Sequence, residues 1–316
     1  MTAESDLTVY FNNQFVPLVE AKVGILTHAL QYGTGVFEGI RGYWDAAEDE
    51  LYLVRPFEHY QRWRTNCRIL QLELGVEPHQ LTQITAELVK RNEFHTNIYI
   101  RPLAWRSAQQ VGLHADNKVG FSIVAMPFGD YLDSRNGLHA GVATWRRVED
   151  TAIPGRAKIC GAYVNSVLAS DEARANGFDE AILLNENGQV AEGASCNIFI
   201  LRGHKLITPA PSDNILEGIT RDCVMQLGSH EMGLDVVERS IDRTEIYIAD
   251  EVFFTGTAVE IAPIVKVDHR PIGNGKIGPL TNELRQLYKS AALGRLRKWR
   301  DWAFPVYRRL RAGRAA

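Results

Sequence analysis

Segments with strand character and segments with helical character follow one another along this chain without the regular β–α–β alternation of a doubly wound parallel sheet. Strands are predicted at residues 7–15, 97–105, 120–126, 140–145, 197–201 and 251–254. Helices are predicted where apolar residues recur at helical spacing, at residues 56–70, 82–91 and 165–175 and from about Thr220 onward. A hairpin is predicted around residues 185–188. This order favours an α+β fold.

The length of the chain indicates more than one domain. With 316 residues it is about twice as long as a typical single domain. Residues 127–136 are rich in glycine, aspartate, serine and asparagine, which favours a linker. We predict a small N-terminal domain over residues 1–131, a linker over 132–136, a larger domain over 137–294 and a basic, aromatic C-terminal tail over 295–316.

The C-terminal tail differs in charge from the rest of the chain. It holds eight basic residues and one acidic residue, so the net charge of −3 divides into +7 for the tail and −10 elsewhere. Aromatic residues interleaved with bases are typical of a membrane-surface or RNA-binding segment. The run is short and Pro305 interrupts it, which favours a terminal helix packed by its aromatic side chains with its arginines in water.

Composition excludes several classes of protein. Apolar residues make up 45% and charged residues 23% of the chain, as in ordinary globular proteins, and the overall charge argues against nucleic acid as a partner. Apolar runs such as Ala181–Leu184 are far shorter than the roughly 20 residues that cross a bilayer. The acidic start, residues 1–6, is unlike a secretory signal. The four cysteines are widely spaced without a CxxC pair, so we expect a cytoplasmic protein with reduced thiols, no membrane partner and no metal.

One glycine-rich run matches a nucleotide-binding motif only by its letters. Gly273–Gly278 reads GxGxxG, but a dinucleotide site needs this run between a strand and a helix, with an acidic residue about 20 positions later. Pro279 follows at once, and Pro271 lies in the approach. We therefore expect a hairpin turn here and no bound nucleotide.

Two short segments are suited to holding a phosphate group. In Leu216–Asp222 an irregular stretch leads into a helix, with Gly218 relaxing the backbone and Thr220 near the cap. Exposed amides and the helix dipole at such a point attract an anion. Thr255–Ala258, after the strand at 251–254, is a second small-residue run of this kind. Either segment alone is typical of an ordinary cap or turn, whereas the two together indicate an anchored phosphate on a cofactor.

Two charged residues lie in runs of small residues. Lys158 belongs to the stretch Ile153–Tyr163, and an amine confined there near another cation loses its proton more readily and becomes a nucleophile and a base. A surface lysine before a helix is the alternative. Glu192 is the single acid in Val190–Asn197. Its carboxylate could approach a flat ligand closely, or it could be an ordinary turn residue.

These motifs occur in one order together with several others. The additional ones are His28–Thr34 (HALQYGT), Phe37–Arg41 (FEGIR) and Tyr99–Pro102 (YIRP). From about Tyr10 to Tyr288 the chain resembles the class IV pyridoxal-phosphate aminotransferases, and most closely the branched-chain amino acid aminotransferases. The resemblance implies a two-domain enzyme of fold type IV, with an α/β small domain and a β-barrel-like core in the larger domain. It also implies a homodimer or a higher homo-oligomer.

The resemblance implies that pyridoxal 5'-phosphate is the cofactor. Lys158 matches the lysine that joins the cofactor as an aldimine and then carries a proton between substrate and cofactor. Tyr163 matches the residue that hydrogen-bonds the cofactor's phenolic oxygen. Glu192 matches the carboxylate that keeps the pyridine nitrogen protonated, so that the ring accepts electrons. The groups matching the phosphate site are Arg62, the amides of Ile219 and Thr220, and Thr257.

The resemblance also implies the substrates, because the family exchanges amino groups between branched-chain L-amino acids and 2-oxoglutarate by a ping-pong mechanism. Tyr99 and Arg101 share one face of the strand at 97–105, since side chains alternate along a strand. In the family the tyrosine lines an apolar pocket, and the arginine takes the distal carboxylate of glutamate. The backbone at Thr257–Ala258 matches the α-carboxylate site. The other matching pocket positions, the first two assigned to the neighbouring subunit, are Tyr32, Leu113, Phe37, Gly39 and Tyr131.

Some positions depart from the family pattern, namely Glu217, the pairs Ser195–Cys196 and Trp105–Arg106, and the basic tail. They leave open a D-amino acid or (R)-amine transaminase, or an aminodeoxychorismate lyase, which would need Lys158 but not Arg101. A non-enzymatic binding protein that acts through its tail is the alternative from another class.

Overall fold

The structure is a computed structural model that describes residues 7–129 and 131–308. The acidic start and the last eight residues of the predicted tail lie outside these ranges. The chain divides into two compact units: unit 1 is residues 1–129 with 290–316, and unit 2 is residues 130–289. The first division falls just before the predicted linker. The second falls inside a helix, α7 (Pro279–Ala292), rather than at residue 294.

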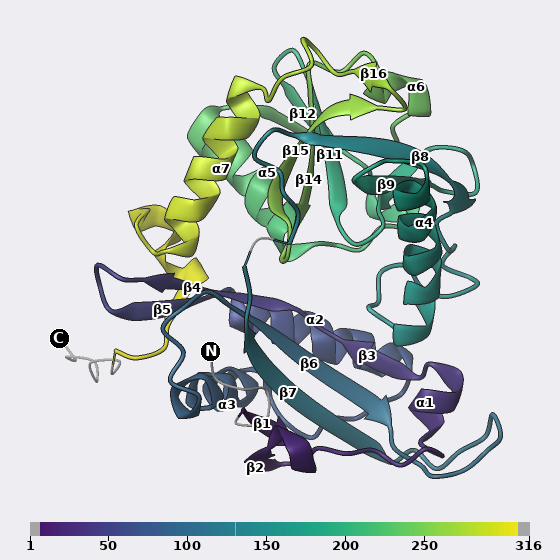
Figure 1. The fold of residues 1–316 in the computed structure, drawn as a ribbon, viewed down its shortest axis with the longest axis vertical. Helices are drawn as coiled ribbons and strands as arrows, with labels where there is room; N and C mark the ends of the chain where they lie inside the picture. The colour runs from purple at the N-terminus through teal and green to yellow at the C-terminus, as the bar shows by residue number, and fades with distance from the viewer. Residues whose placement is uncertain (1–6, 130, 309–316) are drawn as a thin grey trace. The chain divides into compact units, whose positions relative to one another are not determined.

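Unit 1 is built on an antiparallel sheet with strands in the order β17-β5-β4-β6-β7-β1-β2 and with β3 beside β6. The strands are β1 (Thr8–Phe11), β2 (Gln14–Pro17), β3 (Gly35–Phe37), β4 (Ile40–Asp45), β5 (Glu50–Val54), β6 (Ile98–Arg106), β7 (Val119–Pro127) and β17 (Ala303–Pro305). The helices are α1 (His28–Tyr32), α2 (Pro56–Ile69) and α3 (Pro78–Arg91), with 3-10 helices at Leu18–Glu20 and Arg297–Trp302. Helices α2 and α3 cover one face of the sheet (Figure 1).

The sequence explains how α2 packs. Pro56 opens the helix, because its fixed φ suits a first helical position. Tyr60, Trp63 and Cys67 then recur on one face and are fully buried. Trp63 Nε1 donates a hydrogen bond to the carbonyl of Val36 at 2.9 Å, which fastens α2 to β3. The predicted helix at 56–70 is confirmed.

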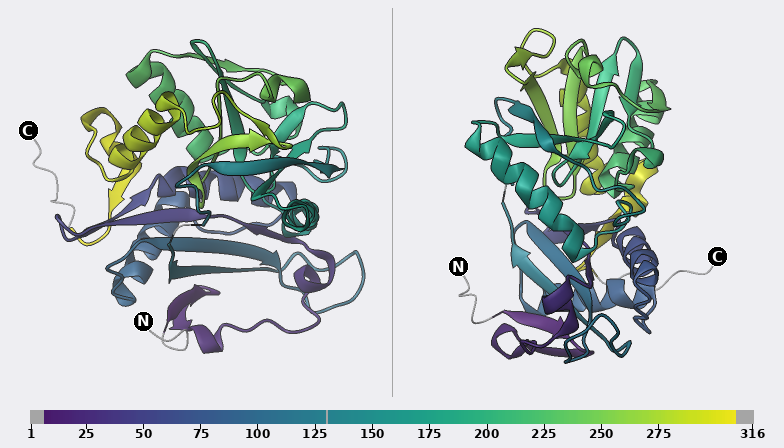
Figure 2. Two further views of the ribbon diagram at one scale, coloured as in Figure 1. Left: turned by 45° about the horizontal axis from the view of Figure 1, so that its top comes forward. Right: turned by 90° about the vertical axis from the view of Figure 1, so that its right-hand side faces the viewer.

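Unit 2 contains a mixed sheet in the order β10-β9-β8-β15-β14-β11-β12-β13, with β16 beside β15. The strands are β8 (Leu138–Arg146), β9 (Glu180–Leu184), β10 (Val190–Gly193), β11 (Asn197–Arg202), β12 (Lys205–Thr208), β13 (Asp235–Glu238), β14 (Glu251–Gly256), β15 (Glu260–Val267) and β16 (Arg270–Pro271). The helices, besides α7, are α4 (Tyr163–Ala175), α5 (Ile219–Met232) and α6 (Arg243–Ile246), with 3-10 helices at Cys160–Ala162 and Pro211–Asp213. The sheet curls around a buried apolar core (Figure 2). The predicted α+β class is confirmed.

The C-terminal segment is part of unit 1. Trp299 and Trp302 are buried in the 3-10 helix, and β17 pairs with β5 at the edge of the sheet. The aromatic side chains pack as expected, but the segment forms a 3-10 helix and a strand rather than a terminal α-helix. The segment packs on unit 1 instead of remaining in solvent because its tryptophans are buried there and because β5 offers an unpaired edge.

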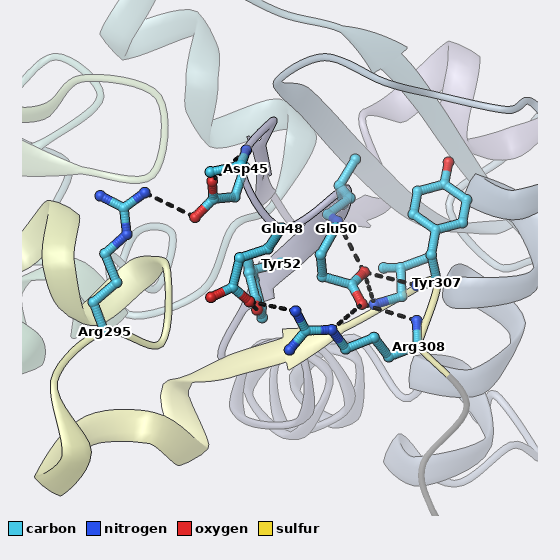
Figure 3. A network of polar contacts seen from close by, with 10 residues as sticks. Asp45, Glu48, Glu50, Tyr52, Arg295, Tyr307 and Arg308 are labelled. Carbon is cyan, nitrogen blue, oxygen red and sulfur yellow. Dashed lines mark hydrogen bonds and ion pairs between the residues drawn. The ribbon is translucent and has the colours of Figure 1, made fainter.

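A polar network fastens this segment to the sheet (Figure 3). The carboxylate of Glu50 is fully buried and accepts hydrogen bonds from the amides of three successive residues, 306–308. Arg308 also pairs with Glu48, and Arg295 lies 2.8 Å from Asp45. Two of the basic side chains of the predicted tail are thus paired with acids of the first unit.

The glycine-rich run Gly273–Gly278 is not a hairpin turn, so this expectation was wrong. The hairpin turn lies earlier, between β15 and β16, where Asp268 and His269 have positive φ angles of 47° and 64°. The glycine run leads instead into α7, whose Leu280 and Thr281 amides donate to the carboxylate of Glu251. A carboxylate of the chain itself therefore occupies the end of the helix at which a phosphate could bind.

Among residues 7–129 and 131–308, no helix is both long and apolar enough to cross a membrane. The same ranges hold no group of three or more histidine, cysteine or acidic side chains placed to bind a metal ion.

Candidate active site

The predicted cofactor lysine contacts the predicted tyrosine. Lys158 Nζ donates a hydrogen bond to the hydroxyl oxygen of Tyr163 at 2.8 Å. A single 3-10 helix, Cys160–Ala162, follows the lysine and leads into α4, which begins at Tyr163. This one turn brings two residues five positions apart face to face. Both residues are half-buried, so each can meet a ligand.

Glu192, on β10, is a buried carboxylate with several polar neighbours. Its Oε1 lies 2.9 Å from Nε of Arg147, although that N–H is not aligned for a hydrogen bond, so the contact is an ion pair. Its Oε2 accepts hydrogen bonds from Asn197 Nδ2 at 3.0 Å and from the Leu216 amide at 3.1 Å. Burial raises the pKa of Glu192, and the charges of Arg147 and Lys158 oppose this rise.

Asn197 connects this carboxylate to the first predicted phosphate segment. Its Nδ2 also donates to the carbonyl of Leu216 at 2.8 Å, and its Oδ1 would lie 2.0 Å from a β-carbon placed on Gly218. Gly218 is the N-cap of α5, and no side chain caps this helix. Ile219 and Thr220, the first helical residues, are buried. A buried helix start without a side-chain cap presents its first amides to an anion, which fits a phosphate.

The second predicted phosphate segment is the tip of a hairpin. Strand β14 ends at Gly256, which pairs with the first residue of β15, so Thr257 and Ala258 lie in the connecting turn. Thr255 pairs with Asn197 of the neighbouring strand β11. Within the described residues the buried hydroxyl of Thr255 has no hydrogen-bond partner. Thr257 and Ala258 therefore come shortly after Thr255, the strand residue that pairs with Asn197.

Unit 1 brings three of the predicted substrate residues together. Arg101 Nη2 donates a hydrogen bond to the Tyr99 hydroxyl at 3.1 Å, and its guanidinium lies 4.6 Å from the centre of the Phe37 ring. Tyr99 is buried, whereas Arg101 is exposed. The two residues share one face of β6 as predicted. A cation thus lies at the solvent end of an aromatic surface.

The remaining predicted pocket side chains are exposed. Tyr32 is 37% exposed, Leu113 is 77% exposed and Tyr131, in unit 2, is 47% exposed. The Tyr32 hydroxyl accepts a hydrogen bond from the Gly112 amide at 2.9 Å. The structure therefore places Tyr32 beside the loop that carries Leu113.

Arg62, the predicted phosphate ligand, belongs to a buried cluster that the sequence analysis missed. Its Nε and Nη2 donate to the two carboxylate oxygens of Glu38 at 2.7 and 2.9 Å. His59 Nδ1 lies 2.8 Å from the same carboxylate. The spacing of His59 and Arg62 places them on one face of α2, but Glu38 lies 21 positions before His59 and nothing local marks it. Arg147 was missed for the same reason.

The structure gives a local explanation for some of the residues that depart from the family pattern. Trp105 stacks on Phe11 with ring centres 5.6 Å apart, and Cys196 is buried in the core of unit 2. Glu217 is exposed and lies 3.5 Å from Arg156. Nothing in the structure explains why an acid occupies position 217.

Known proteins resemble this chain over nearly its whole length. Residues 35–267 match the family described as amino-transferase class IV. A probable branched-chain-amino-acid aminotransferase of Aquifex aeolicus is 46% identical over 299 residues, which cover 94% of this chain and 96% of the relative. The chain belongs to the class IV aminotransferase family.

Solved structures agree with this assignment. The branched-chain aminotransferase of Thermoproteus uzoniensis, crystallised with norvaline, has a TM-score of 0.91 and 41% identity, covering 95% of this chain and 99% of the relative. The branched-chain amino acid aminotransferase of Thermobaculum terrenum, in its holo-form with PLP, has a TM-score of 0.92 and 37% identity, covering 97% of this chain and all of the relative. A third such enzyme, in complex with N-(5'-phosphopyridoxyl)-L-glutamate, has a TM-score of 0.90 and 39% identity, with coverage of 95% and 99%. Within the family, these relatives are all of the branched-chain type.

Proposed function

We propose that this protein transfers amino groups between branched-chain L-amino acids and 2-oxoglutarate, with pyridoxal 5'-phosphate as its cofactor. The observation that carries the proposal is the set of groups in unit 2: the Lys158–Tyr163 pair, the buried Glu192 carboxylate and the uncapped start of α5. They offer an amine for an aldehyde, a carboxylate for a ring nitrogen and amides for a phosphate. The phosphopyridoxyl adduct in one crystallised relative supports this choice of cofactor.

The residues would divide the work as follows. When bound, pyridoxal phosphate supplies a sink for the electrons released at the α-carbon of the substrate. Lys158 would hold the cofactor covalently and move a proton to and from the α-carbon at Nζ, which Tyr163 orients through its hydroxyl. Glu192 would share a proton with the ring nitrogen, because burial raises its pKa. Arg62, the Ile219 and Thr220 amides and Thr257 would hold the phosphate.

The substrate pocket would use the contact between Tyr99, Phe37 and Arg101. The two aromatic rings suit a branched aliphatic side chain, and the guanidinium at their exposed end suits the distal carboxylate of glutamate. Because Arg101 is exposed, it can turn between Tyr99 and a carboxylate without a large desolvation cost. Tyr131, Gly39 and the backbone at Thr257–Ala258 would complete the pocket. The norvaline and the phosphopyridoxyl-glutamate in two of the crystallised relatives support an aliphatic and an acidic substrate, respectively.

We further infer that the active form is a homodimer in which Tyr32 and Leu113 complete the pocket of the partner subunit. The bridge between Thr27 and Gln109 holds α1 beside the loop that contains Leu113. Exposed apolar side chains gather on α1, on the residues just before it and on this loop, namely Ile25, Leu26, Leu30, Val111 and Leu113. On α4, Val164, Val167 and Leu168 form another exposed apolar stripe. Surfaces of this kind are typical of an interface, and a second copy is the occupant that would also place Tyr32 at a pocket.

A cytoplasmic location agrees with the state of the thiols. None of the four cysteines forms a disulfide, and three of them, Cys67, Cys196 and Cys223, are buried. Burial raises the pKa of Cys67 to about 12, so this thiol stays protonated and inert. Free thiols are typical of proteins that work in a reducing compartment.

Covalent labelling and absorbance test the proposal. The purified protein with pyridoxal phosphate should absorb near the edge of the visible range, and L-leucine and L-glutamate should bleach this band, whereas D-alanine and a simple amine should not. Borohydride treatment and peptide mapping should place the pyridoxyl group on Lys158. Lys158→Ala should abolish the label, and Lys205→Ala, at an exposed position of the same unit, should keep it. A label on another lysine, or bleaching by D-alanine, would contradict the proposal.

A further inference from the structure

Glu38 is a buried carboxylate surrounded by hydrogen-bond donors. It lies between β3 and β4 and has no exposed surface. Arg62 donates from Nε and Nη2 at 2.7 and 2.9 Å, His59 Nδ1 lies at 2.8 Å, and the amide of Gly39 donates at 3.0 Å. The proposed reaction does not use this acid. Its place in the interior of unit 1 therefore has another reason.

The charges in this cluster balance. Burial alone would raise the pKa of Glu38, but the charge of Arg62 and the hydrogen bond with His59 outweigh it and hold the pKa below its usual range. Burial also lowers the pKa of His59, so its imidazole is neutral near pH 7. Because a carboxylate only accepts hydrogen bonds, the proton of this imidazole lies on Nδ1. The cluster thus consists of a carboxylate, a guanidinium and a neutral donor.

This arrangement fixes the direction of Arg62. Two parallel hydrogen bonds hold the guanidinium in the plane of the carboxylate, with its Nε–Nη2 edge toward Glu38. The opposite edge then points away from the buried acid. The Arg62 side chain is 14% exposed while that of Glu38 is 0% exposed, so the arginine is less deeply buried than the acid that holds it.

The Glu38 carboxylate also contacts the backbone of the predicted substrate pocket. Glu38 is the chain neighbour of Phe37 and Gly39, and it accepts the Gly39 amide proton. Gly39 packs directly under the hydroxyl of Tyr99. One buried acid therefore connects the arginine on α2 to the backbone beneath the pocket tyrosine.

We propose that Glu38 is a positioning residue that fixes the direction of the Arg62 guanidinium and holds Gly39 in place under Tyr99. This inference rests on the proposed function, since it assigns the phosphate to Arg62. Glutamine cannot replace the carboxylate, because its NH₂ group would face one of the donors of Arg62, His59 or Gly39. Loss of the paired charge would also release Arg62 from its fixed direction.

The test compares two ligands that differ only in the phosphate. The apoprotein and its Glu38→Gln variant are titrated with pyridoxal 5'-phosphate and, separately, with pyridoxal, and Kd is measured by absorbance and fluorescence. Glu38→Gln should raise Kd for the phosphorylated form about tenfold or more and leave Kd for pyridoxal within about twofold. Arg62→Met should give the same phosphate-specific loss, and the double variant should lose little more than Arg62→Met alone.

The outcomes separate the two proposals. Glu58→Gln, which alters another acid of α2, serves as the control and should bind both ligands like the wild type. Equal loss of both ligands in Glu38→Gln, or no loss, overturns the positioning role. If this variant does not fold, Glu38→Asp takes its place, because it keeps the charge but draws the carboxylate back from its partners. The expected changes in Kd for pyridoxal 5'-phosphate and for pyridoxal are then the same. A wild-type protein that binds neither ligand at Lys158 refutes the proposed function itself, whatever the variants do.

Discussion

A β-carbon placed on Gly39 would lie 2.0 Å from the hydroxyl oxygen of Tyr99. No side chain fits at position 39 while the tyrosine keeps its place. Tyr99 is buried on β6, which is paired on both sides, so the ring has little room to move. The absence of a side chain at Gly39 is therefore what lets the tyrosine hydroxyl reach this part of unit 1.

We expect Gly39→Ala to displace Tyr99. An overpacked interior position costs about 1–3 kcal/mol of unfolding free energy, and kcat/KM for leucine and for glutamate should each fall by about tenfold or more because the pocket changes shape. Urea unfolding and steady-state kinetics measure the two effects. Gly129→Ala is the matched control, because no atom lies within 4 Å of a β-carbon placed there. Equal effects of the two variants would disprove the packing argument.

Arg101 should distinguish acidic from apolar substrates. Arg101→Met removes a hydrogen bond to a charged group, worth about 1.5–3 kcal/mol, so KM for glutamate and 2-oxoglutarate should rise about 10–100-fold. KM for leucine should change less than about threefold, because the aromatic surface of Phe37 and Tyr99 remains. Arg101→Lys keeps the positive charge but lacks the planar guanidinium, so its KM for glutamate should lie between those of the wild type and Arg101→Met. If KM rises equally for leucine and for glutamate, the arginine supports the shape of the pocket instead of recognising a carboxylate.

Local patterns were enough to predict several parts of the site. Tyr99 and Arg101 share a face because side chains alternate along β6, so a single element carries this information. The role of Tyr163 came only from the resemblance to the family, and the short 3-10 helix between the two residues puts its hydroxyl in contact with Lys158. The start of α5 was also predictable, since Gly218 and the following helix are adjacent in the chain.

Contacts between distant elements could not be predicted in this way. Arg147 meets Glu192 only because β8, β9 and β10 pair in their particular register. Buried acids such as Glu38 and Glu50 look in the sequence like any solvent-exposed acid. The glycine-rich run misled us because the real turn uses Asp268 and His269, and the short polar side chain of aspartate tolerates a positive φ.

Arg147 should control the pH dependence of the reaction. Burial raises the pKa of Glu192, and the nearby charge of Arg147 limits that rise. Without this charge the pKa rises further, so less of the carboxylate is ionised at a given pH. The acid limb of the kcat/KM profile of Arg147→Met should therefore move to higher pH, by about one unit for each 1.4 kcal/mol of lost interaction. Arg146→Met, at an exposed neighbouring position, should leave the profile unchanged; a shift toward acid would refute the assignment.

Mixed dimers should reveal whether Tyr32 works across the interface. A Lys158→Ala chain and a Tyr32→Ala chain, each weakly active alone, should regain about a quarter of wild-type activity when refolded together. Random pairing makes half the dimers mixed, and each mixed dimer has one intact pocket. A mixture of Lys158→Ala and Glu192→Gln chains is the control and should regain nothing, because both residues belong to the same subunit's site. No recovery in the first mixture would place Tyr32 in its own subunit's pocket.

Glu50 should matter for stability rather than for catalysis. Glutamine at this position leaves one of the amides of Val306, Tyr307 and Arg308 without an acceptor, which costs about 1–3 kcal/mol. Urea unfolding followed by circular dichroism measures the loss. Glu87→Gln removes an exposed pair with Arg91 and should cost less than about 1 kcal/mol. A comparable loss of unfolding free energy in the two variants would show that the buried Glu50 network stabilises the fold no more than an exposed ion pair does.

Strand β17 is the last strand of unit 1 along the sequence, and this has a consequence for biosynthesis. Residues 303–308 leave the ribosome after every other strand of the first unit has been made. Until then, the edge of β5 has no strand partner, and the Glu50 carboxylate lacks the amide donors of residues 306–308. A premature stop codon at position 303 would spare every side chain of the proposed catalytic centre. It would nevertheless yield a nascent polypeptide that can never close the sheet with which its translation began.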